Sequence, residues 1–140
     1  MQLQGSCLCG KVSYQAMLEH DAINISHCHC VCCQKAHTAA FATYTRVAQQ
    51  QLQINGAEHL RHFESSKHAV RSFCQHCGSH LFFRYHHLPD AVFLAVASLN
   101  QPPAVNQAMH IYTKSTVAWC PVSDDLPQYL EYPKSQDKNS

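Results

Sequence analysis

Long apolar runs are absent from this chain of 140 residues. The longest continuous apolar segment, Ala91–Ala97, has the length of a β-strand, whereas a membrane-spanning helix needs about 20 apolar residues. The segment Met1–Cys7 has neither the basic start nor the apolar stretch of a secretory signal peptide. We therefore expect a cytoplasmic protein that makes no contact with a membrane.

Charged residues are also scarce, at 14% of the chain with a formal net charge of +1. Nucleic-acid-binding domains depend on clustered Lys and Arg side chains that neutralise phosphates. The polar C-terminal end carries only Lys134 and Lys138, partly offset by Asp137. We therefore expect no nucleic-acid partner. The length suits one domain, which we place at residues 1–132, followed by a polar and disordered tail at residues 133–140.

Helical periodicity is missing as well. No stretch of about 12 residues repeats apolar side chains at helical spacing, and only Ala36–Ala42 has room for one helical turn. Short segments rich in β-branched and aromatic residues predict strands instead. These are Lys11–Ala16, Phe41–Val47, Leu52–Asn55, Leu60–Glu64, Val70–Phe73, Leu81–Tyr85, Val92–Ala97 and His110–Tyr112. The predicted fold class is mostly β.

Three of these patterns make specific predictions about packing. Val92–Ala97 is apolar on both faces, which predicts a central strand. Asn55-Gly56 favours a tight turn, which predicts that the strand before it pairs with Leu60–Glu64 in a hairpin. The segment around Trp119 is expected to pack in the core.

Cysteine and histidine are abundant, with 9 and 12 residues. An odd number of cysteines in a chain without an export signal disfavours a secreted disulfide scaffold. In a reducing compartment, closely spaced cysteines are more often metal ligands or catalytic groups.

Two cysteine pairs predict one structural zinc site. Cys74 and Cys77 form a C-x-x-C motif followed by Gly78, which allows the backbone to curl so that both thiolates face one ion. A structural zinc ion takes four ligands, and Cys7 and Cys9 supply the other two. The alternatives are ordinary buried thiols and a redox dithiol, which is disfavoured because no helical pattern follows Cys77.

Cys28, Cys30 and Cys33 predict a second site. In an extended segment Cys28 and Cys30 point to one side, and Cys33 completes a C-x-x-C motif with Cys30. Three protein ligands with an open fourth position are typical of catalytic zinc. Two alternatives remain: an empty cluster of reactive thiols, and a closed site whose fourth ligand is His27, His29 or His37.

Three ordered motifs carry a family resemblance. Gly5–Val12 (GSCLCGKV), Cys28–Lys35 (CHCVCCQK) and Phe73–Ser79 (FCQHCGS) resemble the glutathione-dependent formaldehyde-activating enzyme family, which also contains the centromere-protein-V-like proteins. His110-Ile111-Tyr112 and the following Trp119 are similar to that family's last strand region. The resemblance covers nearly the whole predicted domain.

The resemblance implies a zinc-binding catalytic domain with an Mss4-like fold, a β-tent of short antiparallel sheets joined at a structural zinc site. It implies a structural zinc on Cys7, Cys9, Cys74 and Cys77, and a labile catalytic zinc on Cys28, Cys30 and Cys33. The reaction attributed to the founding members is the condensation of glutathione with formaldehyde, a carbon–sulfur lyase reaction. Two departures lie beside the second cluster: Gln34-Lys35 replaces the family's Arg-Lys, and Ala36–Ala40 replaces a Gly/Ser-rich step.

Three thiolates outweigh the charge of one Zn²⁺ ion, so the complex is anionic and suits activation of a substrate thiol better than hydrolysis. We predict a zinc-dependent carbon–sulfur lyase resembling S-(hydroxymethyl)glutathione synthase, acting on a small thiol such as glutathione. The candidate proton donors are His29, His37 and Lys35, and the candidate partners for substrate carboxylates are Lys35, Arg46, Arg71 and Arg84. The alternative is a non-catalytic zinc-binding module that binds a protein partner, which requires a closed second site and an exposed apolar patch.

Overall fold

The structure is a computed structural model that describes residues 1–133, and it contains two β-sheets and one short α-helix. The small sheet consists of β1 (Gln2–Ser6), β2 (Ser13–Met17) and β5 (Leu52–Asn55). The large sheet consists of β3 (Ile23–Cys28), β4 (Ala42–Ala48), β6 (Leu60–Glu64), β7 (Ala69–Cys74), β8 (His80–Tyr85), β9 (Ala91–Ala95) and β10 (Val105–Ile111).

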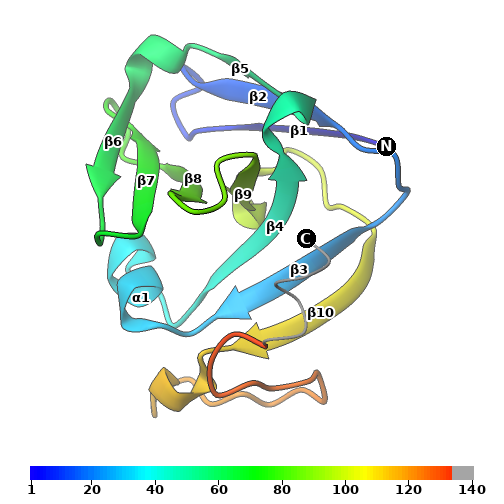
Figure 1. Ribbon diagram of the computed structural model, residues 1–140, viewed down its shortest axis with the longest axis vertical. Coiled ribbons are helices and arrows are strands. Elements are labelled where there is room, and N and C mark those ends of the chain that lie inside the picture. Colours follow the sequence, from blue (N-terminus) through cyan, green and yellow to red (C-terminus); the bar gives the residue numbers. More distant parts are fainter. Residues whose placement is uncertain (134–140) are drawn as a thin grey trace.

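The strands of the small sheet follow the order β1-β2-β5, and those of the large sheet follow β10-β3-β4-β9-β8-β7-β6. Figure 1 shows the large sheet strongly curved, with the small sheet lying across one end of it. The mostly β prediction is therefore confirmed. Across residues 1–133, no helix is long and apolar enough to cross a membrane. Apart from Pro133, the predicted polar tail lies outside the described residues.

The two sheets share one hydrophobic core, and the alternation in β2 explains how. Val12, Tyr14 and Ala16 are buried, and they belong to the same core cluster as Phe82 of the large sheet. The rings of Tyr14 and Phe82 meet edge to face with centroids 5.1 Å apart. The half-buried strand predicted at Lys11–Ala16 is confirmed, although the observed strand starts two residues later and ends one residue later.

The central position predicted for Val92–Ala97 is confirmed for β9. All five residues of this strand are buried, and it lies between β4 and β8 in the middle of the large sheet. A strand covered on both faces gains free energy from apolar side chains on each, which explains the uninterrupted apolar run.

The predicted hairpin at Asn55-Gly56 is wrong. β5 pairs with β2 in the small sheet, whereas β6 pairs with β7 in the large sheet. Gly56 does adopt a positive φ of 78°, but a Cβ there would lie 1.9 Å from the carbonyl oxygen of Lys11. Gly56 is therefore required by a close approach of two backbone segments and not by a hairpin. A 3-10 turn at Ala57–His59 then leads the chain to the other sheet.

The helix prediction is also wrong in its position. The helical turn expected at Ala36–Ala42 is instead the helix α1 (Val31–His37), which follows the second cysteine cluster directly. The Cys30 sulfur caps its N-terminus by accepting a hydrogen bond from the Cys33 amide at 3.3 Å. A helix of only 7 residues is too short to show periodicity in a sequence, because it contains about two turns.

The last strand departs from the prediction as well. β10 begins at Val105, ends at Ile111, and pairs in parallel with β3, although every other pairing of named strands is antiparallel. It is therefore longer than the predicted His110–Tyr112, and the sheets are not purely antiparallel. Trp119 is 75% exposed, so the prediction that it packs in the core is wrong.

Candidate metal centres and the adjoining pocket

The four-cysteine cluster joins the small sheet to the large one. Cys7 and Cys9 lie in the turn between β1 and β2, while Cys74 ends β7 and Cys77 lies in the loop that follows. All four sulfurs lie within 4.8 Å of one another. The sulfur of Cys9 is 3.6 Å from that of Cys7 and 3.7 Å from that of Cys74. A zinc ion bound to four thiolates at about 2.3 Å places its sulfurs about 3.8 Å apart, so this cluster is able to hold a metal ion of that geometry.

Backbone turns bring these sulfurs together. The amide of Gly78, at φ 75°, donates to the Cys74 carbonyl at 2.8 Å, and the amide of Gly10, at φ 80°, donates to the Cys7 carbonyl at 3.1 Å. Each cysteine pair therefore curls around its own tight turn, where a positive φ favours glycine. A hydrogen bond of 2.9 Å from the Leu8 amide to the Ser79 hydroxyl links the two loops directly.

The charge state of this cluster also suits a cation. The hydroxyl of Ser79 donates a hydrogen bond that lowers the pKa of the Cys77 thiol, and two backbone amides add to this, bringing the pKa to about 5. The cluster therefore contains a thiolate at neutral pH. Thiolates are the form in which cysteine binds metal ions.

The three-cysteine cluster comes from one short segment. Cys28 is the last residue of β3, Cys30 caps α1, and Cys33 lies in the first turn of that helix. Their sulfurs lie within 4.8 Å of one another, and in the described part of the chain no histidine or carboxylate joins them. Cys32 is exposed and does not belong to the cluster. The three sulfurs are therefore able to hold a metal ion with fewer than four protein ligands.

The three histidines considered as a fourth ligand make other contacts. His27 Nδ1 hydrogen-bonds Thr43 Oγ1 at 2.7 Å, and His37 Nε2 hydrogen-bonds the Tyr44 hydroxyl. His29 is 1% exposed, and its Nε2 hydrogen-bonds His110 Nδ1 at 2.8 Å. The closed-site alternative therefore gains no support from these side chains.

His29 is the inner end of a polar chain that reaches the surface. His110 in turn hydrogen-bonds Asp124, whose carboxylate lies 3.0 Å from His110 Nε2. This hydrogen bond lowers the pKa of Asp124, and burial lowers the pKa of His29. The chain ties the residue that follows β3 to β10 and to the segment after β10.

Arg71 is a buried cation beside the three-cysteine cluster, and it is 7% exposed. Its Nη2 donates to the sulfur of Cys33 at 3.6 Å, and its Nη1 donates to the Tyr44 hydroxyl at 3.1 Å. Hydrogen bonds from Cys28 and Cys33 lower the pKa of the Cys30 thiol to about 2, and the charge of Arg71 contributes. A buried guanidinium needs a nearby anion, and the cysteine cluster supplies it.

Tyr44 links Arg71 to a pair of half-buried histidines, His37 and His80. Its hydroxyl contacts both Arg71 and His37, and the His37 ring lies against His80 with centroids 4.4 Å apart. Burial lowers the pKa of His37 to about 4 and that of His80 to about 3. Both histidines are therefore neutral at physiological pH.

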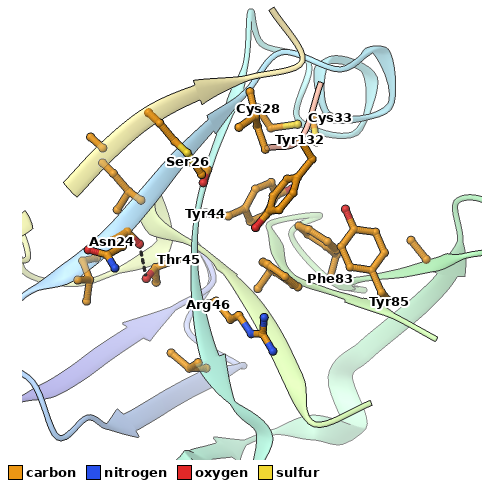
Figure 2. Close-up of a pocket in the computed structure, with 18 of the residues that line it drawn as sticks. Asn24, Ser26, Cys28, Cys33, Tyr44, Thr45, Arg46, Phe83, Tyr85 and Tyr132 are labelled. Carbon is orange, nitrogen blue, oxygen red and sulfur yellow. Dashed lines mark hydrogen bonds between the residues drawn. The ribbon is translucent and has the colours of Figure 1, made fainter. Parts of the chain in front are cut away.

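A pocket of about 1410 Å³ opens beside the three-cysteine cluster, and the four-cysteine cluster takes no part in its lining. Cys28 and Cys33 lie at one end, with Tyr44 and Tyr132 beside them (Figure 2). Of the residues proposed as carboxylate partners, Arg46 and Arg71 line this pocket, whereas Lys35 and Arg84 do not.

Two features of the site and its surroundings escaped the sequence analysis. The first is Tyr44, which lines the pocket in place of the expected proton donors His29, His37 and Lys35. The second is Gln34, whose side-chain amide donates to the carbonyls of His29 and Ser115 at 2.7 and 2.8 Å. Gln34 therefore fastens α1 to the segment after β10. No local signal marks either role, because each also depends on a partner far away in sequence, Ser115 for Gln34 and Arg71 for Tyr44.

Comparisons with known proteins agree on one family. The sequence profile described as "Glutathione-dependent formaldehyde-activating enzyme" matches residues 2–115. An uncharacterized lyase of Schizosaccharomyces pombe is 30% identical over 84 residues, a match that covers 60% of this chain and 58% of the relative. A putative glutathione-dependent formaldehyde-activating enzyme of Halomonas elongata is 25% identical over 126 residues, covering 85% of this chain and 80% of the relative.

One solved structure is also similar. The crystal structure of a Rhodobacter sphaeroides protein superposes with a TM-score of 0.59 at 24% identity, covering 69% of this chain and 87% of that chain. At this identity the likeness shows the fold alone. Two sheets joined at a cysteine cluster are consistent with the Mss4-like fold that the sequence motifs implied.

Proposed function

Because the chain belongs to the glutathione-dependent formaldehyde-activating enzyme family, we propose that it is a zinc-dependent carbon–sulfur lyase resembling S-(hydroxymethyl)glutathione synthase. It joins or cleaves an adduct between a small thiol, such as glutathione, and an aldehyde. Catalysis takes place at Cys28, Cys30 and Cys33, and Cys7, Cys9, Cys74 and Cys77 hold a structural zinc ion. All nine cysteines are free, which supports a reducing, cytoplasmic location.

One observation carries this proposal: three convergent sulfurs line a large pocket, and the described residues add no fourth ligand to them. Soft thiolate donors suit zinc, and the buried Arg71 offsets the negative charge that they carry. When bound there, zinc would supply a Lewis acid that lowers the pKa of a substrate thiol. The alternative of a closed zinc-binding module requires a fourth protein ligand, which the described residues do not provide.

The side chains around the pocket supply what the addition needs. The substrate thiol loses its proton to solvent, and its sulfur forms a bond to the carbonyl carbon. The π electrons of the carbonyl move to its oxygen, and that oxygen takes up a proton from solvent. Tyr44 is placed to donate a hydrogen bond to this oxygen. Arg71 donates to the Tyr44 oxygen at 3.1 Å, and in one tautomer His37 donates as well. The Tyr44 hydroxyl hydrogen can then point into the pocket. The reverse reaction breaks the same carbon–sulfur bond.

Calorimetric titration of the zinc-loaded protein with glutathione and with S-methylglutathione tests the proposal. We expect glutathione to bind more tightly, and the difference to grow as pH rises, because its thiol must lose a proton to act as a ligand. In Cys30→Ser the two ligands should bind alike. Equal affinities for the unaltered protein at every pH would refute the lyase mechanism.

A further inference from the structure

A row of four side chains crosses the large sheet at the floor of the pocket. Arg71 of β7 is paired with Phe83 of β8, Phe83 with Phe93 of β9, and Phe93 with Arg46 of β4. Residues directly opposite one another in a sheet project from the same face. The rings of Phe83 and Phe93 are stacked, with centroids 4.5 Å apart and planes within 5°. The floor is therefore an aromatic pair with an arginine at each end.

Two tyrosines widen this aromatic floor. The ring of Tyr85 lies edge to face against Phe83 and Phe93, at 5.2 and 5.5 Å. The ring of Tyr44 meets Phe83 at 4.6 Å. All four rings line the pocket, and Figure 2 shows Tyr44, Phe83 and Tyr85 around the open space next to the cysteines. Of these four rings, a one-carbon group held at the sulfurs would lie beside Tyr44, whereas a larger group would also reach the others.

The two arginines of the row are in different situations. Arg71 is buried and already hydrogen-bonded to Cys33 and Tyr44. Arg46 is half-buried, and none of the described hydrogen bonds or ion pairs involves its guanidinium. Figure 2 shows the Arg46 guanidinium projecting into the pocket at the end away from Cys33. A guanidinium so placed is a ready partner for a carboxylate.

The spacing suits a ligand that reaches from the sulfurs to Arg46. Cys28 lies opposite Ala42 in the pairing of β3 with β4. Arg46 lies four residues farther along β4, which corresponds to about 13 Å between backbone positions. The volume of about 1410 Å³ exceeds the several hundred Å³ of an ordinary ligand site. A tripeptide-sized thiol with a bulky substituent fits this space and spans this distance.

We propose that the pocket selects adducts in which the carbon attached to sulfur carries a flat apolar group, such as a phenyl ring. The aromatic floor binds that group, and Arg46 binds a carboxylate of the thiol portion. This inference rests on the proposed function and names its substrate class: thiol adducts of aromatic or similarly bulky aldehydes, in preference to formaldehyde. Bond formation is unchanged, and only the group on the carbonyl carbon differs.

The test compares two glutathione thioethers by calorimetry on the zinc-loaded protein. S-methylglutathione imitates a one-carbon adduct, and S-benzylglutathione imitates an aromatic one. We expect S-benzylglutathione to bind at least about tenfold more tightly, because a whole ring leaves water and packs on the floor. Equal affinity, or tighter binding of the methyl compound, would overturn the inference.

Variants separate the two parts of the subsite. Arg46→Gln should weaken both thioethers by about tenfold without changing their ratio, since it removes only the partner of the carboxylate. Tyr85→Leu should reduce the ratio, because it removes a ring and keeps an apolar side chain. Arg61→Gln, on the edge strand β6 and outside the pocket, is the matched control and should change neither. Unchanged binding in Arg46→Gln would refute the carboxylate role.

The outcome that refutes the aromatic subsite differs from the outcome that refutes the proposed lyase function. Both thioethers have a blocked sulfur that has no proton to lose, so their ratio does not depend on a thiol reaching the metal. A benzyl preference that depends on Tyr85 would support the subsite even if free glutathione showed no thiol-dependent binding. Thiol-dependent binding of glutathione without a benzyl preference would leave the lyase proposal standing and overturn the subsite.

Discussion

The two cysteine clusters use similar motifs in opposite ways. The four-cysteine cluster takes its sulfurs from two loops that belong to different sheets and lie far apart in sequence. The three-cysteine cluster takes its sulfurs from a single segment that pairing in the large sheet and the cap of α1 already hold. A metal ion in the first cluster closes a long loop, whereas one in the second closes almost none. The comparison predicts that the first ion belongs to the fold and the second to the chemistry.

The largest effect should follow from breaking the four-cysteine cluster. Cys74 is fully buried, and Cys74→Ser should remove one zinc per chain and destabilise the fold by on the order of 4 kcal/mol or more, because structural zinc contributes directly to folding. Elemental analysis and thermal melting measure both. Cys32→Ser, which alters an exposed cysteine outside both clusters, is the control and should melt like the unaltered protein. Full stability and zinc content in Cys74→Ser would contradict the assignment.

The same change in the second cluster should spare the fold. Cys30→Ser should reduce the rate of adduct formation by at least about a hundredfold. Even the loss of a residue that only hydrogen-bonds a metal ligand commonly lowers metal affinity or activity by 10–100-fold. Serine is a good helix N-cap, so α1 should keep its cap and the melting temperature should shift little. Kinetic assay and melting together make the measurement. A large loss of stability would mean that the second cluster also holds the fold together.

Acid should weaken the packing of His80, the first residue of β8, against His37 of α1. His80 has a folded pKa of about 3 and an ordinary value of 6.5. Since its folded pKa is lowered, its stability contribution is complete above pH 6.5 and is lost as pH falls toward 3. Between pH 6.5 and 5, His80→Gln should therefore lose less stability than the unaltered protein, by on the order of 1 kcal/mol. Urea unfolding at several pH values measures this, with the exposed His20→Gln as control.

The smallest expected effect concerns Arg71. Zinc binding releases the protons that remain on the three cysteines and leaves an anionic complex, which a neighbouring cation stabilises. Arg71→Gln should therefore raise the pH midpoint of zinc loading at this cluster by roughly half a unit. Arg71→Lys keeps the charge and should restore most of the shift. Zinc-loading curves recorded against pH with a chromophoric zinc chelator measure this midpoint. A midpoint that falls in Arg71→Gln would contradict the prediction and show that the Arg71 charge mainly repels the zinc ion.

The cysteine groupings could be predicted from sequence because their causes are local. Cys30 and Cys33 are three positions apart, so a single local turn brings their sulfurs together, and the same holds for Cys74 and Cys77. Joining the latter pair to the cysteines of the first turn followed from counting the ligands of a tetrahedral ion. The central position of β9 could be predicted for a similar reason, since burial of both faces leaves a continuous apolar run.

The rest of the site depends on neighbours that sequence spacing does not reveal. Arg71 meets Tyr44 and Cys33 only because β7 and β4 face one pocket across two intervening strands. In sequence, Arg71 looks like any surface arginine. Asn55-Gly56 shows the limit of turn chemistry, because it fixes a positive φ without saying which sheet receives the next strand. Long-range pairing decided each of these cases.

The parallel pairing of β3 with β10 has a consequence for how the protein is made. In this pairing Cys28 lies opposite Ile111, which the ribosome adds some 80 residues later. That interval takes on the order of ten seconds of translation. During that interval the segment with three cysteines lies outside the ribosome without one of its flanking strands, and its thiols are open to oxidants. Oxidative stress should therefore damage nascent chains more than finished ones, and zinc supplied during synthesis should protect better than zinc added afterwards.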